Sequence, residues 1–107
     1  MSDGFAALFQ EASEQRKLRL LAELSYELTM HGRAAYAAGA DEFADPLRMR
    51  LANEANHRIQ SYLRAYLADR SDRIPDKAFA LVLLESLERL GIAESRLVET
   101  LDGLSGG

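Results

Sequence analysis

The sequence predicts an all-α protein, a small antiparallel bundle of four main helices preceded by one short helix. Three observations support this fold class. Apolar residues recur at the three- and four-residue spacing of helix faces, and no segment alternates polar and apolar residues for long enough to form a strand. Both prolines, Pro46 and Pro75, stand where a helix should begin. The expected helices span residues 3–12, 14–38, 46–69, 75–90 and 93–102.

The N-terminal helical region should contain a break. Its first apolar side chains lie on nearly the opposite face of a straight helix from those of residues 18–35. Ser13, a residue type that caps helix N-termini, marks a suitable position for the break. Two arrangements stay open: the first helix folds back on its own bundle, or residues 1–13 form a docking helix for a partner. In the second case the association residues are Phe5, Leu8 and Phe9.

The helix over 46–69 should begin at Asp45–Pro46, because aspartate is a favoured N-cap and proline a favoured first helical residue. Helical spacing places its apolar side chains, among them Leu51 and Ile59, on one broad face. The opposite face is polar, and we interpret it as a candidate partner-binding surface. This polar face consists of Asn53, His57, Gln60 and Arg64.

The helix over 75–90 carries Leu81 and Val82 away from its main apolar face. Either this helix is central and buried nearly all round, or these two side chains form a dimer contact. We favour the dimer, because exposed apolar patches often become interfaces and two-fold homodimers are the commonest oligomers.

The chain should end in one short helix and a tail. Gly91 suits a C-terminal cap, the last helix covers about 93–102, and residues 103–107 are expected to form a flexible tail. A length of 107 residues predicts a single helical domain over 1–107.

Composition narrows the class of protein. The chain has no cysteine, which excludes disulfides, thiolate metal ligands and cysteine nucleophiles and suits a reducing cytoplasm. The N-terminus lacks the basic region of a signal peptide, and the longest apolar run, 78–84, is too short for a membrane span. The net charge of −4 argues against nucleic acid as a partner. We therefore expect a cytoplasmic protein with neither a membrane nor a nucleic-acid partner.

The charge is unevenly distributed. Residues 46–73 carry six arginines and three acids, whereas residues 1–45 carry four bases and eight acids, and residues 74–107 carry three bases and six acids. The basic middle segment is either neutralised by its own neighbours or faces an acidic partner protein. We interpret the four C-terminal glutamates as solvated acidic faces: Glu85, Glu88, Glu94 and Glu99.

The two histidines do not predict a metal site. Glu54 and His57 have the Glu-x-x-His spacing of carboxylate-bridged di-metal bundles, but such a site needs a second copy of the motif. His31, with Glu27 four residues earlier, is expected to be a partly buried, hydrogen-bonded packing residue. No metal and no cofactor are therefore predicted.

The segment Asn53–Leu63 resembles the H-box of HWE-type sensor histidine kinases. The matching residues are Glu54, His57, Arg58, Ile59 and Leu63, while Gln60 and Ser61 stand where that family has lysine and asparagine. The resemblance implies that His57 accepts a phosphoryl group, assisted by Glu54 and Arg58. No segment resembles the nucleotide-binding domain of such kinases, so the implied function is a phosphotransfer or phosphorelay-adaptor domain. Arginines that could attract a phosphoryl group or an acidic receiver domain are Arg50, Arg58 and Arg64.

No phosphate-binding glycine loop and no serine nucleophile with a plausible base occur in the sequence. We therefore expect a non-enzymatic helical interaction or regulatory module that acts through a protein partner, in the first instance a second copy of itself. The alternative function is histidine phosphotransfer through His57.

Overall fold

The computed structural model describes residues 4–38, 46–69 and 74–104, and every regular element within these ranges is an α-helix. The predicted all-α class is confirmed, and each helix boundary lies within two residues of the expected one. The helices are α1 (Phe5–Glu11), α2 (Glu14–Ala38), α3 (Pro46–Leu67), α4 (Asp76–Arg89) and α5 (Glu94–Gly103).

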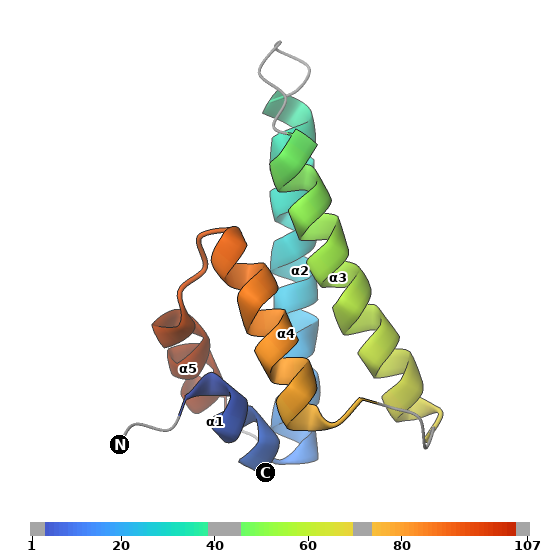
Figure 1. Cartoon of the computed structure of the whole chain (residues 1–107), viewed down its shortest axis with the longest axis vertical. Helices are drawn as coiled ribbons and strands as arrows, with labels where there is room; N and C mark the ends of the chain where they lie inside the picture. The colour runs from blue at the N-terminus through green and yellow to red at the C-terminus, as the bar shows by residue number, and fades with distance from the viewer. Residues whose placement is uncertain (1–3, 39–45, 70–73, 105–107) are drawn as a thin grey trace.

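Helices α2 and α3 form a long antiparallel pair, and the other helices gather around one half of it (Figure 1). The most extensive helix contact in the structure is the one between α2 and α3. Small and polar side chains let the two backbones approach: the Ser25 hydroxyl donates to Oδ1 of Asn56 at 2.6 Å. A Cβ atom at Gly32 would lie 3.6 Å from Oδ1 of Asn53, which is ordinary van der Waals contact. The C-terminal end of α2 and the N-terminal end of α3 extend beyond α4 and α5 (Figure 1).

The predicted break between the first two helices occurs at Ala12 and Ser13. The Ser13 hydroxyl accepts the main-chain N–H of Arg16 at 3.2 Å, which is the contact of an N-cap. Helix α1 then packs against α4 and α5 instead of continuing the line of α2 (Figure 1). Of the two arrangements left open by the sequence, the structure has the one in which the first helix folds back on its own bundle.

An aromatic cluster holds α1, α3 and α4 together. The rings of Tyr62 and Phe79 are stacked, with centroids 4.1 Å apart and an interplanar angle of 15°. The Phe9 ring lies 5.9 Å from that of Phe79 and 6.3 Å from that of Tyr62. All three side chains are buried in the core. Aromatic pairs at these separations stabilise a fold beyond the area that they bury.

A polar contact fixes the same three helices relative to α2. Oδ2 of Asp76, in the first turn of α4, accepts from the Lys17 ammonium at 2.7 Å, and Oδ1 accepts from the Tyr62 hydroxyl at 2.5 Å. The Lys17 nitrogen also lies 5.8 Å from the centroid of the Phe9 ring. The side chains of Lys17 and Asp76 are only 12% and 18% exposed. Removal of either charge would therefore leave the other poorly solvated.

The C-terminal end of the chain is more ordered than expected. Gly91 has φ 84°, its N–H donates to the carbonyl of Glu88, and the N–H of Ile92 donates to that of Leu87, which together form a Schellman cap. Helix α5 runs to Gly103, and Leu104 is buried. The expectation of a flexible tail is therefore wrong for residues 103 and 104, because Leu104 packs into the core. Residues 105–107 lie outside the described part of the chain.

Candidate functional site

The polar face predicted on α3 is exposed. Asn53, His57, Gln60 and Arg64 all face solvent, whereas the apolar residues of the same helix, such as Ile59, are buried. No hydrogen bond or ion pair involves the His57 imidazole among the residues that the structure describes. Both ring nitrogens are therefore accessible to a partner.

Glu54 and Arg58 accompany His57 on α3 without bonding to it. Both side chains are exposed, and neither makes a hydrogen bond or ion pair within the described residues. An open, shallow depression runs over this part of the helix, with half-buried Met49 as its apolar component. Its lining consists of Pro46, Met49, Arg50, Asn53, Glu54, His57 and Arg58.

Three arginines of α3 make no ion pair within the part of the chain that the structure describes. Arg50, Arg58 and Arg64 are exposed, and none of them contacts an acidic group in the described chain. Two arginines on other helices are paired: Arg89 lies 3.0 Å from Glu85, and Arg96 contacts Glu27. None of these three residues forms an ion pair within the described residues, although Glu54 lies four residues from both Arg50 and Arg58 on the same helix.

The outer face of α4 carries an exposed apolar residue. Leu81 is 52% exposed, although Phe79, Ala80, Leu83 and Leu87 of the same helix are buried. The interpretation that α4 is buried nearly all round is therefore wrong at Leu81. Val82 is half-buried, and its carbonyl accepts the Ser86 hydroxyl at 3.2 Å. A second shallow depression on this face is lined by Leu81, Leu84, Glu85, Glu88 and Arg89.

The N-terminal residues do not form a docking surface in this structure. Phe5 and Phe9 were expected to contact a partner if α1 docked on another subunit, but both are 0% exposed. Leu8 is half-buried and packs against the same core. The physical reason is the break at Ser13, which turns the apolar side of α1 towards α4 and α5 of its own chain.

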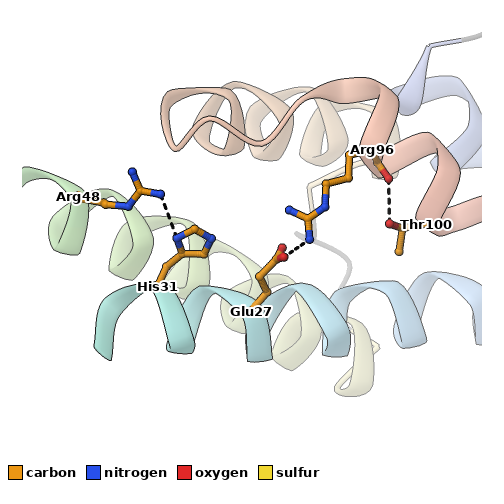
Figure 2. A network of polar contacts seen from close by, with 5 residues as sticks. All are labelled: Glu27, His31, Arg48, Arg96 and Thr100. Carbon is orange, nitrogen blue, oxygen red and sulfur yellow. Dashed lines mark hydrogen bonds and ion pairs between the residues drawn. The ribbon is translucent and has the colours of Figure 1, made fainter. Parts of the chain in front are cut away.

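His31 belongs to a polar network between α2, α3 and α5 (Figure 2). It is half-buried, and its Nδ1 lies 3.3 Å from Nη2 of Arg48 on α3. Because arginine only donates hydrogen bonds, Nδ1 acts as the acceptor here. One turn earlier on α2, the Glu27 carboxylate accepts a hydrogen bond from the Arg96 guanidinium of α5 (Figure 2). This arrangement agrees with the expected packing role of His31, although the partners Arg48 and Arg96 were not foreseen.

Glu94 has a role that the sequence did not indicate. Although the residue is exposed, its Oε2 accepts the main-chain N–H of Phe5, the first residue of α1, at 2.9 Å. An N–H group at this position has no partner inside its own helix. The glutamate of α5 therefore caps α1 across the bundle.

The described residues contain no group of three histidine, cysteine or acidic side chains placed to hold a metal ion. None of the helices in the described ranges is both long enough and apolar enough to cross a membrane.

The fold and the exposed faces define this chain as a small all-α bundle protein with two candidate contact surfaces, the outer faces of α3 and α4. No family model, curated protein or solved structure matches the chain.

Proposed function

We propose that this protein is a non-enzymatic helical interaction module that forms a homodimer through the outer face of α4. The observation that carries the proposal is the 52% exposure of Leu81 at the middle of a helix whose other large apolar residues are buried or half-buried. Transfer of this side chain and half-buried Leu84 from water into a contact between two copies would be favourable.

The charges around Leu81 suit pairing with a second copy. Lys77 precedes Leu81 by four residues and Glu85 follows it by four, so that all three lie on one ridge of α4. In an antiparallel pair of α4 helices with the two-fold axis at Leu81, each Lys77 faces the Glu85 of the other copy. Lys77 has no ion-pair partner among the described residues. The same contact then occurs twice, as two-fold symmetry requires.

The dimer should be weak. Helix α4 has 14 residues, and a single pair of helices of this length buries less area than a standard interface. We expect a dissociation constant of about 10 μM or weaker, so that association is reversible over the concentration range of a sedimentation experiment.

Sedimentation equilibrium of the wild type and of Leu81→Asp tests the proposal. The wild type should form dimers as its concentration rises. Leu81→Asp should stay monomeric because its dimer interface would bury two carboxylates, one from each copy, at the two-fold axis. Leu67→Asp is the matched control, since Leu67 is 76% exposed but lies at the end of α3. It should dimerise as the wild type does. A wild type that stays monomeric at about 500 μM, or equal effects of both substitutions, would contradict the proposal.

Histidine phosphotransfer through His57 is the second candidate function, favoured by the exposure of this imidazole beside Arg58 on a helical bundle. The imidazole would attack the acyl phosphate of a phosphorylated receiver domain. A P–N bond would form as the P–O bond breaks, the imidazole proton would pass to water, and the receiver carboxylate would be released.

The test of phosphotransfer is incubation with a set of phosphorylated receiver domains that carry labelled phosphate. Acid-labile label should appear on the wild type and on His31→Ala, and it should be absent from His57→Ala. No label on the wild type, or label retained by His57→Ala, would rule out the phosphotransfer function and leave the interaction function standing.

A further inference from the structure

One side of α3 carries three arginines that make no ion pair within the described residues. Arg50, Arg58 and Arg64 lie eight and six residues apart, which corresponds to about 12 Å and about 9 Å along the helix axis. At 100° per residue their side chains fall within a sector of about 120°. His57 lies within the same sector, so that four basic or titratable groups follow one side of a straight helix for about 21 Å.

One acidic residue interrupts this basic stripe. Glu54 lies four residues after Arg50 and four before Arg58, within the same sector, and it is exposed. A ligand that follows the stripe therefore meets the charges in the order positive, negative, positive, positive. Half-buried Met49 supplies an apolar contact in the depression at the N-terminal end.

We propose that this face of α3 binds an acidic helical segment of a partner protein. The segment would place carboxylates opposite Arg50, Arg58 and Arg64 and a basic residue opposite Glu54. Arginine forms bidentate contacts with carboxylates, and complementary charges of this kind fix the register of one helix against another. This inference rests on the proposed interaction function, but it uses a helix that the α4 dimer leaves uncovered.

A protein segment fits the stripe better than the other common polyanions. A nucleic acid or an anionic membrane presents negative charge throughout, so that Glu54 would face a like charge. The whole chain also carries a net charge of −4, which repels extended polyanions. A short acidic helix can match both the length of the stripe and the position of its one carboxylate.

The test uses labelled alanine-rich helical peptides and fluorescence anisotropy. The first peptide has three glutamates, spaced eight and then six residues apart, and a lysine in the middle of the eight-residue gap. The second peptide has the same residues in the reverse order along the chain, so that parallel and antiparallel binding are both tested. One of these peptides should bind the wild type. The same peptides with every charge reversed should not bind.

Arg58→Glu should weaken peptide binding by about tenfold or more, because it replaces an attraction by a repulsion. Arg89→Glu is the control. It changes the net charge by the same amount at a side chain that is 60% exposed on α4, and it should alter binding by less than about twofold. Glu54→Lys should weaken the binding of the lysine-containing peptide. It should strengthen the binding of a peptide that has glutamate in place of that lysine.

Three results would overturn the proposal. The first is no binding of either peptide order to the wild type. The second is equal loss of binding in Arg58→Glu and Arg89→Glu, which would indicate general electrostatic attraction. The third is tighter binding of short duplex DNA, or of vesicles of phosphatidylcholine and phosphatidylserine, than of the peptides. Leu81→Asp should bind the peptide as the wild type does, so failure of the dimer is distinguishable from failure at this surface.

Discussion

The main-chain N–H of Phe5 donates a hydrogen bond to Oε2 of Glu94 at 2.9 Å, and this contact connects the first helix of the chain to the last. The chain reverses direction at Ser13, and the Ser13 hydroxyl accepts a hydrogen bond from the main chain of α2. This hydrogen bond caps α2 but does not orient α1. Glu94 provides a polar contact that orients α1 across the bundle. It also places a negative charge at the positive end of the α1 dipole.

Replacement of Glu94 by alanine should therefore destabilise the protein. The free energy of unfolding should fall by about 1 kcal/mol, the usual effect of losing a capping side chain. Glu99→Ala is the control, because Glu99 is exposed on the same helix and makes no hydrogen bond or ion pair within the described residues. Urea titrations followed by far-UV circular dichroism give both values. Equal stabilities of the two variants would show that the contact with Phe5 does not contribute.

The contact between Lys17 and Asp76 should contribute more than the surface ion pair of α4. Asp76→Ala should lower the free energy of unfolding by about 2 kcal/mol, because it leaves the Lys17 ammonium and the Tyr62 hydroxyl without this acceptor in a poorly solvated place. Glu85→Ala removes an exposed partner of Arg89 and should cost at most about 0.5 kcal/mol. Thermal and urea denaturation measure the difference, and a larger loss in Glu85→Ala would contradict this assignment.

We expect that glycine is required at position 91 because the backbone there is left-handed, and not because a larger side chain would clash. Its φ is 84°, and no atom lies within 4 Å of a Cβ added there. Gly91→Ala should therefore cost about 1–2 kcal/mol, the price of a left-handed conformation for an L-residue. Gly103→Ala meets the same open space inside α5 and should be neutral or stabilising by up to about 1 kcal/mol. Equal effects at the two positions would contradict the argument from φ.

The sequence was sufficient to predict the helices, because apolar periodicity defines them and several boundaries carry a local signal. Pro46 begins α3, the Ser13 hydroxyl caps α2, and Gly91 ends α4. The phase of the apolar residues also located the break before α2. The helices against which α1 packs could not be predicted from the sequence. The burial of Phe9 depends on contacts with Tyr62 and Phe79, which are distant from Phe9 in the sequence.

The exposed faces were predicted in part. Helical spacing placed His57 and Arg64 on the polar side of α3, where the structure has them. Which arginines are paired could not be predicted, because pairing depends on the helices that become neighbours. Arg96 contacts Glu27, which lies 69 residues away in the sequence, whereas Arg58 contacts no acidic side chain among the described residues. Lys77 was also overlooked, although its position four residues before Leu81 is a signal that the sequence contains.

A charge-reversal experiment tests the central claim, dimerisation through α4, most directly. Lys77→Glu places two acids opposite each other in a homodimer, and Glu85→Lys places two bases there, so each variant alone should be monomeric. In an equimolar mixture every pair across the interface is attractive, and sedimentation equilibrium should recover heterodimers with an affinity close to that of the wild type. Circular dichroism confirms that both variants are folded. Dimers in either variant alone at the wild-type affinity, or monomers in the mixture, would contradict the claim.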